Sequence, residues 1–137
     1  MVTKSAGKKA SVGLRLDPIR ESEALAKRCV EICEDCKAEN ILLFDVRKTS
    51  VLADFYLICN GTSDPHLRAI RVRLEKELAP AGVKLLHTSG TPASRWIILD
   101  FNTVLVHVFL PEMREFYKIE ELWAQEPVIY RSRDAAV

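Results

Sequence analysis

The sequence predicts an α/β fold of the α+β kind, in which a single mixed β-sheet carries flanking helices. Two observations lead to this prediction. Short apolar runs of strand length alternate with stretches whose apolar residues recur every three or four positions, which is the period of a helix. Two of these runs, within residues 95–110, are separated by only two polar residues and so form a hairpin, which leads straight into a helix that begins at a proline. The expected order of elements is α-β-β-α-β-β-β-α.

The composition is that of a folded globular domain. The chain has 137 residues, of which 48% are hydrophobic and 28% charged, and its formal net charge is +1. With so small a net charge, any contact with nucleic acid must come from local basic patches. No apolar run reaches the roughly 20 residues needed to cross a bilayer, so no membrane partner is expected. The N-terminus lacks the apolar core of a secretory signal, and together with four cysteines this indicates a reducing cytoplasm.

Residues 1–16 are rich in lysine, serine and glycine and are expected to form a disordered basic tail. Solubility and a weak contact with RNA phosphate are both compatible with such a tail. Asp17 and Pro18 then mark the start of a helix, because aspartate favours the N-cap position and proline the first helical position. The helix is expected to run to about Ala38, with one face formed by Leu25, Cys29, Ile32 and Cys36.

Two strands are expected next. Residues 40–46 are an apolar run between polar residues, which is typical of a buried strand. A polar turn separates this run from a second strand over residues 55–59, and so short a connection makes the pair antiparallel. The second strand ends at residues 60–63, a turn that contains Gly61.

A second helix is expected to begin at Asp64 and Pro65, which repeat the start signal, and to end at residues 80–82, which contain a proline and a glycine. A short strand over residues 83–87 and a loop over residues 89–94 lead from this helix to the hairpin. The apolar face of the helix is formed by Leu67, Ile70, Leu74 and Leu78.

The last helix is expected to begin at Pro111, directly after the hairpin, and to end at Pro127. The remaining residues, 127–137, are expected to form a loose C-terminal tail. Four side chains of the helical segment are expected to pack inward: Met113, Phe116, Leu122 and Trp123.

The hairpin has two different faces if Asn102 and Thr103 form its whole loop. One face is apolar throughout and is expected to face the core. The other is too apolar for idle exposure and too polar for a dry core. Two interpretations remain: helices cover this mixed face and hydrogen-bond its polar groups, or it is a protein interface with aromatic anchors. The mixed face consists of Trp96, Ile98, Asp100, Leu105, His107 and Phe109.

The cysteine spacing Cys29-x3-Cys33-x2-Cys36 is that of radical-SAM iron–sulfur sites. The same spacing also places three thiols on one helix face, and a free cysteine packs like a small apolar residue. Core packing is therefore the interpretation we prefer, and no metal site is expected. Metal-ligand spacing is also missing among the three histidines, His66, His87 and His107.

The turn at residues 61–63 follows a strand and opens a helix, where backbone N–H groups can hold a phosphate. However, neither the lysine-containing P-loop pattern nor a GxGxxG pattern is present. A small-residue turn at this point also serves simply to reverse the chain and cap the helix, and this second interpretation is the one we prefer.

Several segments occur together in a specific order and spacing: DV at 45–46, ADFYLIC at 53–59, GTSD at 61–64, RWIILD at 95–100, HVFLPE at 107–112 and REFY at 114–117. As a set they closely resemble the ribosomal silencing factor family, also called Iojap. The resemblance runs from about Leu25 to Trp123, and the domain is assigned to residues 17–126. The basic tail lies outside it.

This resemblance implies a cytoplasmic factor with no catalytic activity and no cofactor. Members of the family bind the large ribosomal subunit through its fourteenth protein and block joining of the small subunit, which lowers translation when nutrients are short. Relatives in mitochondria and chloroplasts act on organelle large subunits, with a role in assembly. The implied fold is a mixed sheet with flanking helices that is similar to the nucleotidyltransferase core.

A nucleotide-binding or nucleotidyltransferase-type enzyme is the alternative. Such an enzyme needs a Gly-Ser turn followed by a pair of acids that holds a divalent metal at the triphosphate. Residues 61–63 imitate the turn, but the helix that follows carries no acid pair through Leu74. On the hairpin, Asp100 is followed by Asn102 instead of a second carboxylate. The catalytic acids are therefore missing, and neither a catalytic residue nor a small-molecule substrate is expected.

The expected partner-binding residues lie on the mixed hairpin face and the turn into the last helix. Trp96 is the expected buried anchor, and Asp100 is expected to accept hydrogen bonds from a basic ribosomal protein. A homodimer through the same mixed face is a further expectation. Phe109, Glu115 and Tyr117 are expected around this centre, whereas Arg68, Arg71 and Arg73 form either a contact with ribosomal RNA or a solvated basic face.

Overall fold

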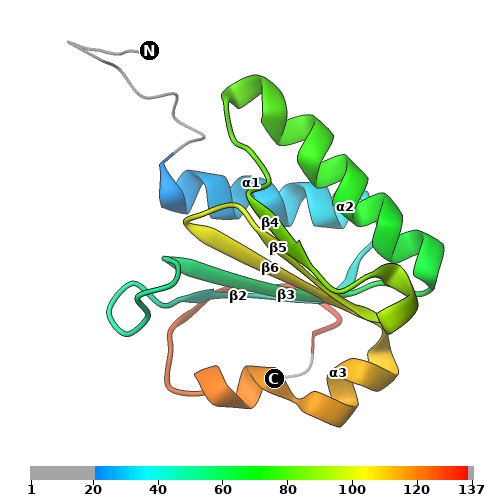
Figure 1. Ribbon diagram of the computed structural model, residues 1–137. Coiled ribbons are helices and arrows are strands. Elements are labelled where there is room, and N and C mark those ends of the chain that lie inside the picture. Colours follow the sequence, from blue (N-terminus) through cyan, green and yellow to red (C-terminus); the bar gives the residue numbers. More distant parts are fainter. Residues whose placement is uncertain (1–20, 136–137) are drawn as a thin grey trace.

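One six-stranded mixed sheet forms the centre of the molecule (Figure 1). The computed structural model describes residues 21–135, so the expected basic tail at 1–16 and the start signal at Asp17 and Pro18 lie outside the described residues. The strands follow the order β4-β5-β6-β3-β2-β7. Their bounds are β2 Glu39–Asp45, β3 Phe55–Asn60, β4 His87–Ser89, β5 Trp96–Asp100, β6 Val104–Phe109 and β7 Val128–Arg131.

The predicted mixed sheet with flanking helices is confirmed. Strands β2 and β3 are antiparallel, as their short connection indicated, and β5 and β6 form the expected hairpin. A parallel pairing of β3 with β6 joins these two units, with Phe55 opposite Val104 and Asn60 opposite Phe109. This central pair is the reason that the sheet is mixed, and it places the hairpin beside the buried strand β3.

The segment that was expected to be a loose C-terminal tail instead adds an edge strand. Strand β7 pairs antiparallel with β2, with Tyr130 opposite Leu43. Further along, Ala135 is buried in the core, and the Ser132 hydroxyl accepts a hydrogen bond from the backbone N–H of Ile41 at 2.9 Å. The prediction for residues 127–137 was therefore wrong for 128–135, because the exposed edge of β2 offers backbone partners to this short run.

Helices α1 (Ser22–Asp35) and α2 (Asp64–Leu78) cover one face of the sheet (Figure 1). Their predicted apolar faces are buried, except that Cys36 is only half-buried. Cys29 and Cys33 lie in this main core, which confirms the core-packing interpretation, and burial raises the pKa of the Cys29 thiol to about 12. Within residues 21–135 no helix is both long and apolar enough to span a membrane.

Three boundaries differ from those expected. Helix α1 ends at Asp35, before the expected end at about Ala38, because the backbone turns at Lys37, where φ is 66°. Ser63, and not Asp64, is the N-cap of α2, and its hydroxyl accepts a hydrogen bond from the backbone N–H of His66 at 3.2 Å. The short strand expected over residues 83–87 begins only at His87. The chain that follows α2 reaches the edge of the sheet just before this residue, where the Leu86 N–H donates a hydrogen bond to the Asp100 carbonyl.

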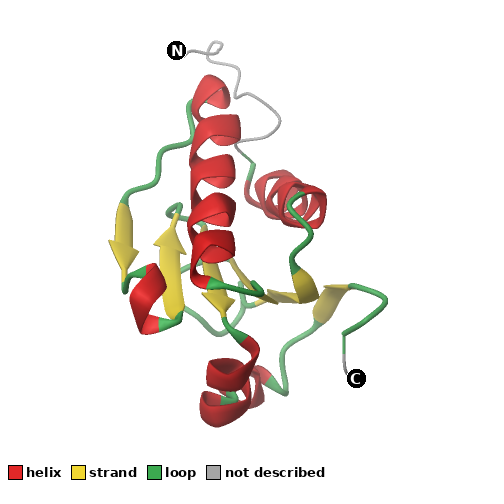
Figure 2. Cartoon of the chain, turned by 90° about the vertical axis from the view of Figure 1, so that its right-hand side faces the viewer, coloured by secondary structure: helices red, strands yellow, loops and turns green. Residues whose placement is uncertain are grey.

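The opposite face of the sheet carries a shorter helical layer (Figure 2). Helix α3 (Pro111–Tyr117) stops at Lys118, whose backbone is left-handed with φ of 47°, and the 3₁₀ helix η4 (Ile119–Trp123) follows. The single helix expected from Pro111 to Pro127 is thus broken into two pieces. Met113 and Trp123 pack inward as predicted, but Phe116 is 73% and Leu122 79% exposed, so the inward packing expected for these two was wrong.

Candidate functional site

The hairpin has the predicted register. Trp96 lies opposite Phe109, Ile98 opposite His107, and Asp100 opposite Leu105. The turn closes with a hydrogen bond from the Phe101 N–H to the Val104 carbonyl at 3.0 Å, and Asn102 adopts φ of 78°. The predicted apolar face is buried in the main core, in contact with α1 and α2, and consists of Ile97, Leu99, Phe101, Val104, Val106 and Val108.

The mixed face is covered only in part. His107 and Phe109, on β6, are buried, whereas Trp96, Ile98 and Leu105 are half-buried. Trp123 from η4 covers the β6 side, where its ring centroid lies 5.4 Å from that of His107 and 4.6 Å from that of Tyr56. Each of the two interpretations of this face therefore fits one part of it. Helical cover applies to His107 and Phe109, whereas Trp96 and Ile98 of β5 and Leu105 of β6 form a partly open apolar strip.

Trp96 is held rigidly at one end of this strip. Its ring stacks on Phe109 with centroids 4.7 Å apart and an interplanar angle of 22°, and it contacts the Tyr117 ring at 5.0 Å. Its indole N–H donates a hydrogen bond to Nδ1 of His107 at 3.4 Å. Because its polar atom is already satisfied, the exposed part of the indole is an apolar surface fixed in one orientation, which suits an interface anchor.

His107 is an uncharged part of this arrangement. Burial lowers the pKa of its imidazole to about 4, so the ring is neutral at physiological pH. Nδ1 must lack a proton in order to accept the hydrogen bond from Trp96. His107 therefore acts as a neutral acceptor beneath the anchor, and it brings no charge to the mixed face.

Asp100 lies at the other end of the strip. It is four residues along β5 from Trp96, roughly 13 Å away, and its side chain is half-buried. Its Oδ1 accepts a hydrogen bond from the backbone N–H of Asn102 at 2.7 Å, which stabilises the hairpin turn. Trp96 and Asp100 thus share a face as expected, but they stand at opposite ends of it and do not form one cluster.

The other expected partner-binding residues differ in how much surface they offer. Tyr117 is 50% exposed and joins Trp96 at the open surface, and Glu115 is exposed and pairs with Lys118 at 3.2 Å. Phe109 is completely buried, so it supports Trp96 from below and offers no surface of its own. Among the expected residues, the structure brings together Trp96, Phe109 and Tyr117.

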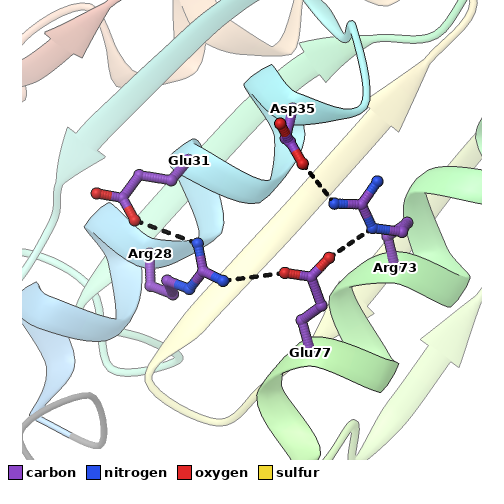
Figure 3. A network of polar contacts seen from close by, with 5 residues as sticks. All are labelled: Arg28, Glu31, Asp35, Arg73 and Glu77. Carbon is purple, nitrogen blue, oxygen red and sulfur yellow. Dashed lines mark hydrogen bonds and ion pairs between the residues drawn. The ribbon is translucent and has the colours of Figure 1, made fainter.

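The three arginines of α2 are not equivalent. Arg73 is held in an ion-pair network with α1 (Figure 3), in which its guanidinium contacts Asp35 at 2.6 Å and Glu77 at 2.5 Å. Hydrogen bonding from Arg73 lowers the pKa of the Asp35 carboxyl. Arg28 completes the network through Glu31 and Glu77. Arg73 is therefore already bound by carboxylates, which argues against the RNA contact that was one of the two alternatives for it. Arg68 is exposed and Arg71 is half-buried.

The turn at residues 61–63 is used for structure. The Gly61 N–H donates to the Phe109 carbonyl at 2.8 Å, and the Thr62 N–H donates to Nδ1 of His66 at 2.9 Å. A Cβ at Gly61 would lie 2.7 Å from Cδ2 of Leu67, so a larger residue at this position would have to displace that buried side chain. These N–H groups are already bonded within the protein, which supports the capping interpretation. Across residues 21–135 no group of three or more His, Cys, Asp or Glu side chains could hold a metal ion.

Comparison with known proteins places this arrangement in context. Residues 19–136 match the model of a family described as "Ribosomal silencing factor during starvation". The chain is 33% identical over 106 residues to ribosomal silencing factor RsfS of Bacillus subtilis, which covers 77% of this chain and 90% of that protein. It is 31% identical over 97 residues to "Mitochondrial assembly of ribosomal large subunit protein 1" of Mus musculus, which covers 69% of this chain and 42% of that protein. A crystal structure of a Chromobacterium violaceum protein has a TM-score of 0.71 at 31% identity, over 75% of this chain and 86% of that one.

Proposed function

This chain belongs to the ribosomal silencing factor family, as its sequence motifs indicated, and we propose that it represses translation by binding the large ribosomal subunit. In this proposal, the bound domain occupies space that the small subunit needs, so that joined ribosomes do not form. The proposal places the protein in the cytoplasm, where it lowers translation under nutrient limitation. It requires neither a cofactor nor a catalytic step.

The observation that carries the proposal is the indole of Trp96, which is fixed in one orientation and partly exposed at one end of the open apolar strip. An anchor that is already ordered loses little conformational entropy on binding, so more of its burial contributes to affinity. The neighbouring apolar side chains Ile98 and Leu105 are half-buried and extend the strip towards Asp100. Such a surface fits a protein partner better than it fits a nucleic acid, because its main part is apolar.

We propose that the partner is the fourteenth protein of the large subunit. Ribosomal proteins are commonly basic, and Asp100 at the far end of the strip would accept hydrogen bonds from a cationic side chain while Trp96 is buried at the near end. Glu115 and Tyr117 would border the contact. The name of the Mus musculus relative, which refers to assembly of a ribosomal large subunit, supports a partner on that subunit. Arg68 and Arg71 would lie close enough to ribosomal RNA for phosphate contacts only if α2 also faces the subunit.

Sedimentation with isolated ribosomal subunits tests the proposal. Wild-type protein should travel with large subunits and reduce the fraction of joined ribosomes when small subunits are added. Trp96→Ala should weaken binding by about 2 kcal/mol or more, roughly thirtyfold, if Trp96 is the central anchor. Val72→Ala is the control, because it truncates an exposed apolar side chain that lies on α2, away from the hairpin face.

Two results would contradict different parts of the proposal. If wild-type protein leaves subunit joining unchanged, the proposed function is wrong. If Trp96→Ala remains folded and binds like the Val72→Ala control, the function stands and the assignment of the anchor is wrong. Light scattering of the free protein would show whether a homodimer through the mixed face competes with subunit binding, since Trp96→Ala should then dissociate that dimer.

A further inference from the structure

Helix α3 and η4 meet at Lys118 in a bend that turns apolar side chains to solvent. Phe116, Tyr117 and Leu122 are 73%, 50% and 79% exposed, and the rings of Phe116 and Tyr117 contact each other with centroids 4.9 Å apart. We call residues 111–123 the elbow. Several large apolar side chains exposed within one short segment of a folded domain commonly mark a binding surface.

The fold does not need these side chains for its core. Met113, Ile119 and Trp123 are the elbow residues that pack into the second core cluster against the sheet. The left-handed backbone of Lys118 ends α3 and lets η4 begin in a new direction, which frees Phe116 and Leu122 from the core. The exposure of Phe116 and Leu122 therefore follows from the change of direction at Lys118. Because neither side chain is buried in the folded chain, core packing does not explain why large apolar residues occupy these two positions.

The elbow and the residues that follow it are acidic. Residues 111–126 contain five glutamates and two basic residues, Arg114 and Lys118, which gives a net charge of −3 (2 − 5). Arg114 does not offset this charge at the surface, because its side chain is only 9% exposed. Its guanidinium is turned inward, where it donates hydrogen bonds to the Asn40 carbonyl at 2.5 Å, to Oδ1 of Asn60 at 3.0 Å and to Glu120 at 3.0 Å.

Two carboxylates beside the exposed rings form ion pairs with cations of the same chain. Glu115 pairs with Lys118 at 3.2 Å, and Glu112 pairs with Arg95 at 3.6 Å. All four side chains are at least half exposed, and pairs of this kind contribute little and are screened by salt. Cations of a partner can therefore take the places of Lys118 and Arg95 at little cost.

We propose that the elbow binds a protein segment in which arginine or lysine alternates with apolar residues. Guanidinium or ammonium groups of that segment would lie on the faces of Phe116 and Tyr117 and contact the neighbouring glutamates, while its apolar residues cover Leu122. Tyr117 also contacts Trp96, so the elbow continues the docking surface. The assignment of this segment to a large-subunit protein rests on the proposed function. Recognition of a basic apolar segment by the elbow does not depend on that function.

A titration of the full-length protein tests this without ribosomes. The probe is a synthetic peptide in which arginine alternates with leucine, and the readout is the set of backbone amide shifts in NMR spectra. The shifts should gather at the elbow, and Phe116→Ser with Leu122→Ser should weaken peptide binding at least about tenfold. The matched control, Val51→Ser with Leu52→Ser, removes two side chains that are 99% and 72% exposed on the β2–β3 connection and should change binding less than about twofold.

The charge component has its own pair of variants. Glu112→Gln with Glu115→Gln should weaken peptide binding and flatten its dependence on salt, because fewer ion pairs remain to be screened. Glu39→Gln with Glu75→Gln removes the same charge from exposed positions outside the elbow and should leave the salt dependence as in wild type. A peptide in which glutamate alternates with leucine should not bind the elbow.

Several outcomes would overturn the inference. Shifts that gather elsewhere, or Ser variants that bind as well as wild type, exclude the elbow as the site. A dimer that Phe116→Ser with Leu122→Ser dissociates identifies a second copy of the chain as the occupant. If the peptide binds the elbow only after residues 1–16 are removed, the occupant of the elbow is the basic N-terminal segment of the same chain. If the peptide binds the elbow but the protein does not sediment with large subunits, the inference is supported and the proposed function is wrong.

Discussion

The imidazole of His107 shows how one polar residue is accommodated within an aromatic cluster. It lies among Trp96, Tyr56, Phe109 and Trp123, with ring centroids between 5.4 and 6.4 Å from its own. These neighbours exclude water but offer no anion, so burial alone lowers its pKa. The hydrogen bond from Trp96 satisfies one ring nitrogen and orients the indole at the same time. A residue that looks like a polar defect in the strand therefore helps to hold the anchor.

We expect the stability of the protein to fall between pH 8 and pH 5 because of this residue. The unfolded chain takes up a proton on His107 near its ordinary pKa of 6.5, whereas the folded protein resists protonation down to about pH 4. The unfolded state therefore binds more protons below pH 6.5, and stability is lost as the pH falls through this window. By linkage the loss at pH 5 is about 2 kcal/mol.

Urea unfolding at pH 8 and pH 5 measures this loss. His107→Leu should remove most of the difference between the two pH values, because the group that titrates is gone. His87→Asn is the control, since His87 is exposed, and it should keep the difference of the wild type. An unchanged pH dependence in His107→Leu would show that another group is responsible.

Among the elements, β7 is a short strand that closes one edge of the sheet. It has only four residues, yet it covers the edge of β2, which would otherwise offer unpaired N–H and C=O groups to other chains. Tyr130 packs against the main core, and its hydroxyl donates a hydrogen bond to Glu34 of α1. Strand β7 thus connects the sheet edge to the helical layer.

Removal of residues 127–137 should therefore destabilise the protein by at least about 2 kcal/mol, because the edge pairing and the burial of Tyr130 and Ala135 are lost together. Chemical denaturation gives the free energy of unfolding, and light scattering should show increased association through the bare edge of β2. Ile129→Thr, which keeps the strand and changes a half-exposed side chain, should lose much less. Equal stability of the truncated chain and the wild type would mean that β7 is not part of the folding unit.

At the scale of the whole molecule, a single sheet separates two cores. The larger core lies under α1 and α2, and the smaller lies under α3 and η4. Neighbouring residues of one strand contribute to both, as Leu57 does to the larger core and Ile58 to the smaller. Loss of either core would leave apolar side chains of the same strands exposed to water, so the two are expected to unfold together.

Both tryptophans of the chain, Trp96 and Trp123, lie at the smaller core, so their fluorescence reports on that layer alone. Far-UV circular dichroism is dominated by the helices, most of which lie on the other side of the sheet. The urea transitions followed by these two signals should therefore coincide. A fluorescence transition that comes first would show that the layer carrying Trp96 unfolds independently of the rest.

Sequence patterns alone were sufficient for the order of the strands and helices up to α3 and, once Asn102 and Thr103 are taken as the whole loop, for the register and the two faces of the hairpin. Period-2 alternation and a two-residue loop leave only one register that buries the apolar set from Ile97 to Val108. The cysteine positions were also predictable, since a helical period is a local property. Family membership followed from motifs whose order and spacing are specific as a set.

Only the tertiary structure decided which surfaces are open. Whether Phe116 packs inward depends on the left-handed turn at Lys118. Glu77, four residues along α2, is a local partner of Arg73, but its second partner, Asp35 of α1, is one to which no local pattern points. Strand β7 exists because β2 has an unpaired edge, and four residues with little periodicity cannot reveal that. Local patterns determine periods and faces, whereas the exposure of the hairpin face is set by partners that are distant in the chain. The exposure of the elbow depends on the left-handed backbone at Lys118, which a helical period does not reveal.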